Sequence, residues 1–252
     1  MAESLLVETI DRVATLTISR EQRRNAINDA TLRLLKKTLE ELVSADVSAV
    51  ILTGAGSKAF SAGADIKELA AQSMKERIAS TDLGQSVGDM IEQYPRPVIA
   101  AIEGYCLGGG LEMAMCCDYR VCAEGATLGL PEVALGALSS WGGTVRLPRL
   151  VGPARAREVI LFNRRLDAKE ALEWGLVNRV VPQGTSLQAA RALAGEVFAN
   201  TDPGIVSIAK GLLTHGNGAT QRAQRHLELL ADMSVLASDA LQSGVTKFTD
   251  KK

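Results

Sequence analysis

The sequence has few of the residues that metal and nucleophilic chemistry most often use. Its 252 residues include two histidines, His215 and His226, and both lie late in the chain among polar residues, so surface positions are expected for them. The cysteines lack the paired spacing of a zinc site, and their apolar surroundings predict free, buried thiols: Cys106, Cys116, Cys117 and Cys122. No metal site is therefore expected, and the thiols indicate a reducing compartment.

The sequence also lacks a large net charge and a long apolar run. The net charge is −1, which gives no electrostatic support for binding nucleic acid or an anionic membrane. No apolar run reaches the length of a membrane span, and residues 1–12 are acidic with no apolar signal core. We therefore expect a cytoplasmic protein without nucleic-acid or membrane partners. Apolar residues make up 46% of the chain, enough for the core of one large or two small domains.

The pattern of apolar residues predicts an α/β body followed by a helical end. Strands are predicted at residues 5–10, 13–19, 49–53, 98–102, 119–123 and 177–181. An amphipathic helix is predicted over 29–44, with Asp29 as its N-cap. Residues 75–93 are predicted to be helical but irregular or mobile, because Gly84 and Gly88 interrupt them. From about residue 186 onward only helices are predicted, which gives an α/β fold with a helical C-terminal region.

A glycine-rich turn in the middle of the chain is the first candidate for a functional site. The predicted strand 98–102 is followed by three consecutive glycines, 108–110, and then by a buried helix over 111–117. The first N–H groups of a helix have no partner within it, and glycine lets a ligand oxygen come close to the backbone. Glu112 lies just inside this turn in an apolar segment, so it is a candidate catalytic acid or base. The alternative is a tight turn in which the carboxylate only caps the helix.

A second junction of small residues lies earlier in the chain. Residues 54–59 match the loose dinucleotide fingerprint Gly-x-Gly-x-x-Ala after a strand. That motif needs a long helix directly after it, whereas here Gly63 interrupts the segment. The helix is instead predicted to begin near Asp65, so the residues around Ala64 can supply a second backbone N–H donor.

A second carboxylate, Glu132, follows Pro131 in another apolar segment. Two glutamates and two amide donors could form one site if the fold brings them together. The amides would stabilise a developing oxyanion, and the glutamates would move protons or activate water. Apolar surroundings would raise the pKa of both carboxyl groups.

These stretches resemble the enoyl-CoA hydratase/isomerase, or crotonase, superfamily. The resemblance is carried by residues 59–68 (AFSAGADIKE), 104–112 (GYCLGGGLE) and 130–136 (LPEVALG), and it continues through 142–144, 171–177 and 244–251. It implies a crotonase-like spiral of ββα units with a helical C-terminal trimerisation region. We expect the spiral core, with the acyl-CoA site, to span residues 1–190 and the C-terminal helical region to span residues 191–252. It also implies homotrimers or homohexamers and acyl-CoA thioester substrates, with coenzyme A as part of the substrate and no separate cofactor.

The resemblance also assigns roles to individual residues. Ala64 and Gly109 match the two backbone donors of the oxyanion hole, and Glu112 and Glu132 match the two catalytic glutamates of the hydratases. Residues 62–67 match the segment that contacts coenzyme A, and Arg24 lies in the early loop that borders it, although it matches by position rather than by type. The expected substrate contacts are Ala62, Asp65, Ile66, Lys67, Arg24, Phe248 and Lys251.

One segment departs from the family pattern. Ser139, Ser140 and Trp141 stand where relatives often have a small segment such as Pro-Gly. Ser140 and Trp141 are therefore candidates for narrowing or polarising the acyl pocket, and the alternative is that Trp141 packs against the following helix. Cys106 is expected to pack in the core, because no histidine accompanies it as a base.

The expected reaction is the reversible syn addition of water to a trans-2-enoyl-CoA, which gives a 3-hydroxyacyl-CoA. The presence of both glutamates favours a hydratase over relatives that isomerise a double bond. Isomerisation, dehydration or thioester hydrolysis of a specialised acyl-CoA remains an alternative. A non-catalytic relative that binds RNA or protein is an alternative of another class.

Overall fold

A six-stranded sheet forms the base of the body, in the order β1-β2-β3-β5-β7-β10. Its strands are β1 (Leu5–Ile10), β2 (Val13–Ile18), β3 (Ala49–Gly54), β5 (Val98–Ile102), β7 (Tyr119–Ala123) and β10 (Arg179–Val181). β1 and β2 form an antiparallel hairpin, and every other neighbouring pair is parallel. This computed structural model describes residues 4–198, 201–216, 219–236, 238, 241 and 245–246.

A second sheet contains short strands in the order β4-β6-β8-β9. They are β4 (Ala59–Ser61), β6 (Tyr105–Leu107), β8 (Thr127–Gly129) and β9 (Leu166–Asp167). Strands β3, β5 and β7 of the first sheet each continue along the chain into β4, β6 and β8 of the second, and a helix or 3-10 turn follows. This repeat is the predicted spiral of ββα units. Because β4, β6 and β8 are neighbouring parallel strands, the turns that follow them lie next to one another.

The first long helix, α1 (Asp29–Val43), buries the four leucines of its apolar face. The prediction that Asp29 caps this helix is wrong by one residue. Asn28 has the extended backbone of an N-cap and its side chain accepts a hydrogen bond from the Thr31 amide at 3.0 Å. Both residue types cap well, so the sequence alone does not distinguish them.

Helix α3 (Met74–Glu92) corrects a second prediction. It is a regular helix that begins with a capping box between Ser73 and Glu76, rather than an irregular segment. Gly84 and Gly88 are buried in it. A Cβ on Gly84 would lie 2.4 Å from Trp141 Nε1, and a Cβ on Gly88 would lie 3.1 Å from Cys116 Sγ. The glycines therefore provide room for neighbouring side chains.

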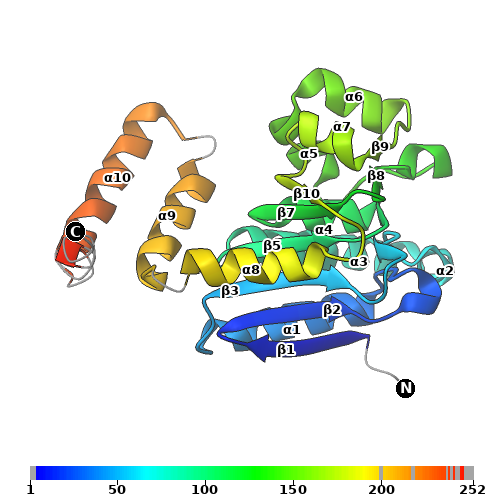
Figure 1. Cartoon of the computed structure of the whole chain (residues 1–252). Helices are drawn as coiled ribbons and strands as arrows, with labels where there is room; N and C mark the ends of the chain where they lie inside the picture. Colours follow the sequence, from blue (N-terminus) through cyan, green and yellow to red (C-terminus); the bar gives the residue numbers. More distant parts are fainter. Residues whose placement is uncertain are drawn as a thin grey trace.

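The later helices fall into two groups (Figure 1). Helices α5 (Gly143–Val151), α6 (Pro153–Leu161) and α7 (Ala168–Glu173) lie together at one end of the body. Helix α8 (Ser186–Phe198) packs on the six-stranded sheet through Ala190 and Ala194. Helices α9 (Pro203–Gly216) and α10 (Gln221–Leu236) project from the side of the body and form what we call the C-terminal arm. The predicted division at residue 190 lies within α8 and stays a prediction.

The sequence predictions for the cysteines and the histidines are confirmed. All four cysteines are free and buried, and Cys106 lies in the main core. His215 and His226 are exposed. Within the described ranges, no helix is both long and apolar enough to cross a membrane, and no cluster of His, Cys, Asp or Glu could hold a metal ion.

The packing of α3 leads to a prediction about stability. Gly84→Ala would force the new methyl group into the Trp141 indole, so we expect the free energy of unfolding to fall by about 1–3 kcal/mol, as in other overpacked cores. Gly195→Ala is the matched control, because Gly195 lies in α8, where an added Cβ would meet no heavy atom of the described residues within 4 Å beyond its chain neighbours and the backbone of its own helix. It should stabilise the protein by about 0.5–1 kcal/mol, since alanine is the better helix former. Urea unfolding measures both; equal effects would show that the indole moves freely.

Candidate active site

A cavity of about 540 Å³ lies where the turns after β4, β6 and β8 meet. Several segments line it: the loop from β4 into α2 (Ile66–Ala71), the first half of α3, the start of α4 (Gly109–Cys116), and the turn η2 (Glu132–Leu135) with the loop after it. The lining brings together eight predicted site residues: Ala62, Ala64, Ile66, Gly109, Glu112, Glu132, Ser140 and Trp141.

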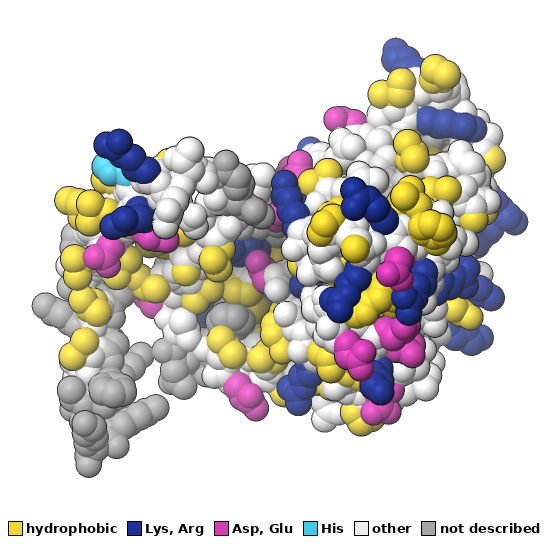
Figure 2. All heavy atoms as spheres, turned by 90° about the horizontal axis from the view of Figure 1, so that it is seen from above, with side chains coloured by type: hydrophobic (Ala, Val, Ile, Leu, Met, Phe, Trp, Pro, Cys, Tyr) yellow, Lys and Arg dark blue, Asp and Glu magenta, His cyan; other side chains and the backbone are white. Residues whose placement is uncertain are grey.

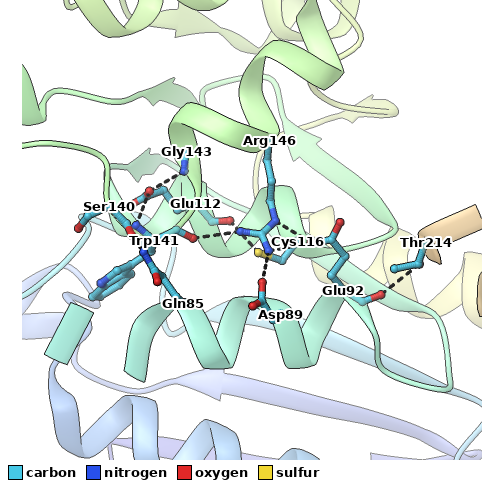
Figure 3. A network of polar contacts seen from close by, with 10 residues as sticks. All are labelled: Gln85, Asp89, Glu92, Glu112, Cys116, Ser140, Trp141, Gly143, Arg146 and Thr214. Atoms are coloured by element: carbon cyan, nitrogen blue, oxygen red, sulfur yellow. Dashed lines mark hydrogen bonds and ion pairs between the residues drawn. The ribbon is translucent and has the colours of Figure 1, made fainter. Parts of the chain in front are cut away.

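Glu112 lies in the first turn of α4 and is only 2% exposed. Its Oε1 atom accepts hydrogen bonds from two backbone amides, Trp141 N at 2.8 Å and Gly143 N at 2.7 Å (Figure 3). Burial raises the pKa of Glu112 to about 7; the negative charge of Glu132 adds to this effect, whereas the two amides and the charge of Arg146 oppose it. A carboxyl group with this pKa can exchange a proton near neutral pH.

Glu132 is the first residue of η2 and is half-buried. Burial raises its pKa, and a hydrogen bond from Ser139 Oγ to its Oε2 atom, at 2.9 Å, opposes that effect. Its other oxygen lies above Gly108, where a Cβ would be 2.9 Å from Oε1. Gly108 also has a φ of +53°, a conformation in which other residues are strained, so glycine is required here twice over.

The two predicted amide donors converge on the same region. Gly109 is the first residue of α4, so its N–H has no partner within the helix. The Ala64 nitrogen lies 3.3 Å from the point where a Gly109 Cβ would be. In the described part of the chain, neither amide donates a hydrogen bond to another group. Bonds between Ile27 and the neighbours of Ala64, both 2.8 Å, fix the loop that carries it. Such a pair of donors can stabilise an oxyanion.

Three predicted substrate contacts support the loop before α2 and do not line the cavity: Arg24, Asp65 and Lys67. Asp65 caps α2 by accepting from the Lys67 amide at 3.2 Å, and it forms an ion pair with Arg20 at 2.8 Å. Burial raises the pKa of Asp65, but Arg20 and the amides outweigh it, so the pKa lies below its usual value. Arg24 accepts from the Ala62 amide through its carbonyl, and its guanidinium lies over the Tyr105 ring. Their contact with a substrate stays a prediction.

Two further predicted contacts, Phe248 and Lys251, lie outside the described residues. Trp141 is 5% exposed and packs on Gly84 of α3 and Gly109 of α4, two helices that precede it in the chain. It also lines the cavity, so its packing and its role at the site are not exclusive alternatives.

Several residues at the site were not predicted. Ser139 is the donor to Glu132, and Arg77 of α3 lines the cavity, although sequence reasoning assigned neither a role. Ser139 stands next to the predicted residues Ser140 and Trp141, which is a weak indication of a role at the site. Its spacing in the sequence does not show that it binds Glu132. Apolar residues complete the wall: Leu69, Ala70, Leu135, Ala137 and Leu138.

Comparison with known proteins finds the same family over nearly the whole chain. The family model described as "Enoyl-CoA hydratase/isomerase" matches residues 8–252. The chain is 37% identical over 254 residues to crotonyl-CoA hydratase of Syntrophomonas wolfei, covering 99% of this chain and 96% of that protein. It is 36% identical to short-chain-enoyl-CoA hydratase of Clostridium acetobutylicum, covering 99% and 95%. The crystal structure of an enoyl-CoA hydratase from Bacillus anthracis superposes with a TM-score of 0.95 at 37% identity, covering 99% and 97%.

The buried Glu112 leads to a prediction about pH. Its pKa rises from an ordinary value of 4.5 to about 7 on folding, so the folded state favours the protonated form. As the pH rises from about 4.5 to about 7, the free energy of unfolding should therefore fall by about 3 kcal/mol, since one pKa unit corresponds to 1.36 kcal/mol. Glu112→Gln lacks this titration and should gain about that much relative to the wild type between about pH 5 and about pH 8, as measured by urea unfolding. Parallel pH profiles of the two proteins would contradict the raised pKa.

Proposed function

The chain belongs to the enoyl-CoA hydratase/isomerase family, and we propose that it is an enoyl-CoA hydratase, which adds water reversibly to a trans-2-enoyl-CoA to give a 3-hydroxyacyl-CoA. One observation carries this assignment: the same cavity is lined by two glutamates with raised pKa values and by two backbone amides that have no hydrogen-bond partner among the described residues. It is supported by full-length relatives that are named crotonyl-CoA and short-chain-enoyl-CoA hydratases.

In the proposed mechanism, the amides of Ala64 and Gly109 donate to the thioester carbonyl oxygen. They polarise the conjugated double bond and stabilise the enolate oxygen that develops as water attacks Cβ. Because these donors are fixed backbone groups in a partly enclosed cavity, they need little reorganisation during the reaction. Removal of one such donor typically costs about two to three orders of magnitude in rate.

The two glutamates bind and activate the water. Glu112 in its ionised form accepts a proton from the water as the oxygen bonds to Cβ, and Glu132 donates a proton to Cα. The added OH and H both come from one face, and the reverse reaction uses the same groups in opposite roles. The two carboxyl groups influence each other, so they are expected to titrate jointly.

The rest of the cavity would receive the substrate. Coenzyme A is part of that substrate, and no separate cofactor is proposed. The segment that carries Ala62, Ile66 and Lys67, from the loop into the start of α2, would border the coenzyme A arm, with Arg24 and Asp65 beside it. Phe248 and Lys251 would contact the adenine end. Trp141 and Ser140 would close the acyl pocket near the reacting carbons, so the pocket would accept short acyl chains. The names of the relatives, crotonyl-CoA and short-chain-enoyl-CoA hydratase, also favour short chains.

The proposed mechanism leads to a prediction about the two carboxylates. Glu112→Gln and Glu132→Gln should each lower the rate of hydration by about two to four orders of magnitude, because each removes a general acid or base. The loss of the conjugated enoyl absorbance of crotonyl-CoA measures this rate, and chromatography identifies the product. Glu103→Gln is a matched control, since Glu103 is also buried but its carboxylate accepts from Gly184 and Ser186 at 3.0 Å and does not line the cavity.

Other products would point to the alternatives. A shifted double bond or free coenzyme A would assign isomerase or hydrolase activity to the same site. No turnover together with salt-dependent retention of RNA would support the non-catalytic alternative, which the net charge of −1 does not favour.

We further propose that the protein forms homotrimers or homohexamers through the C-terminal arm. The arm exposes a run of large apolar side chains, including Leu213 at 76% and Met233 at 59%. Figure 2 shows hydrophobic side chains along the arm and in the hollow between it and the body. A patch of this kind typically marks an interface.

The four buried free thiols support the cytoplasm as the compartment.

The arm can be tested by adding charge to it. Leu229→Glu combined with Met233→Glu should reduce the mass measured by light scattering from an assembly of three or six chains to a smaller species. Val43→Glu is the control, because it places the same charge on an exposed apolar residue of α1. An unchanged mass in the arm variant would argue that α10 lies outside the interface.

A further inference from the structure

We propose that Gln85 and Arg146 are positioning residues for Glu112, because they fix the loop 139–143 whose amides bind its carboxylate. This inference rests on the proposed function, since it explains how one of the two glutamates is placed for the reaction. Neither side chain touches the carboxylate itself in the hydrogen-bond network of the described residues (Figure 3).

Gln85 acts on the same peptide group that binds Glu112. Its Nε2 atom donates to the Ser140 carbonyl at 2.7 Å, and the N–H of that peptide, at Trp141, donates to Glu112 Oε1 at 2.8 Å. A peptide group is planar, so the direction of its C=O sets the direction of its N–H. A bond at the carbonyl also polarises the N–H and strengthens it as a donor. Gln85 and Glu112 therefore lie at opposite ends of one rigid unit.

Arg146 fixes the next peptide group. Its Nη1 atom donates to the Trp141 carbonyl at 3.1 Å. The rest of the guanidinium is bound to α3: Nη2 donates to Asp89 at 2.8 Å and to Glu92 at 2.7 Å, and Nε donates to Glu92 at 2.9 Å. The side chain is 10% exposed, and such a buried cation keeps its position because both carboxylates and the carbonyl are needed to satisfy it.

One face of α3 carries all of these contacts. Gly84 receives the Trp141 indole, Gln85 binds the Ser140 carbonyl, and Asp89 and Glu92 bind Arg146. Spacings of about four residues place these positions on the same side of a helix. Helix α3 thus contacts the loop directly at the indole and at the Ser140 carbonyl, and through Arg146 at the Trp141 carbonyl.

The charges around Glu112 determine what loss of this support would do. Glu132 faces it from η2, Arg146 from α5 and the Cys116 thiol from its own helix, while Asp89 and Glu92 lie behind Arg146 on α3. The amides and Arg146 both favour the ionised carboxylate. If the loop moves, both effects weaken, so the carboxylate should bind a proton more readily.

Trp141 allows the loop to be observed without any reaction. The chain contains two tryptophans, so in a Trp174→Phe background Trp141 is the remaining one. The variants Gln85→Ala, Asp89→Asn with Glu92→Gln, Arg146→Gln and Arg146→Lys are compared in this background. Arg149→Gln is the matched control, because Arg149 is exposed on the same helix as Arg146. The measurements are acrylamide quenching of Trp141, its emission against pH, and kcat and KM for crotonyl-CoA against pH.

The four support variants should show stronger quenching of Trp141 and a kcat lowered up to about 100-fold, the cost of a misplacement of about 1 Å. KM should change much less than kcat, and the acidic limb of the kcat profile should move to higher pH. Arg146→Lys should resemble Arg146→Gln, because an ammonium group cannot reproduce the planar fork. Arg149→Gln should match the background protein in every measurement.

Two results would overturn the proposal. One is wild-type quenching and an unmoved acidic limb in Gln85→Ala and Arg146→Gln, whatever happens to kcat. The other is a full rescue by Arg146→Lys, which would make charge rather than position the cause. Gln85 is exposed, so its alanine variant should fold even where an Arg146 variant does not. If the background protein hydrates no enoyl-CoA, the proposed function fails, whereas the quenching and emission data still decide whether these residues fix the loop.

Discussion

A carboxylate that is almost completely removed from water must be bound by hydrogen-bond donors, and this requirement at Glu112 explains much of the structure around it. The donors are two amides from a loop about 30 positions further along the chain, so that loop must be fixed against α4. The tight turn at Gly108 begins α4, so Glu112 shares the first turn of this helix with the Gly109 amide, which has no partner among the described residues. The glycine face of α3 then makes room for the indole that the loop carries.

The two glutamates are placed by different means, which gives them different chemical characters. Glu112 is enclosed and bound by rigid backbone groups, so its geometry depends on the fold as a whole. Glu132 stands on a short 3-10 turn, is half-buried and is bound by a hydroxyl group that can rotate. A rigid carboxylate suits the orientation of a water molecule, and a more adaptable one suits delivery of a proton to carbon.

The sequence predicted the features that depend on local chemistry. The amide donors at Ala64 and Gly109 follow from small residues at loop-to-helix junctions, and the apolar runs predicted the six strands of the first sheet. The spiral of ββα units was implied by the resemblance to the family and not by the apolar pattern. Features that depend on distant partners were missed. The carboxylate of Asp65 is bound by Arg20, 45 residues away, and Arg146 meets α3 across more than 50 residues. Gly84 and Gly88 suggested flexibility because the sequence does not show which neighbour needs the space of a side chain.

The burial of the four cysteines has a practical consequence for labelling the protein. Burial raises the pKa of the Cys117 and Cys122 thiols to about 12, and it raises the pKa of Cys106 and Cys116 as well. Thiols in this state are inert toward maleimides and methanethiosulfonates while the protein is folded. A single cysteine introduced on the arm would therefore be the one reactive thiol of each chain, and spin labels or fluorophores could be attached there without first removing the native cysteines.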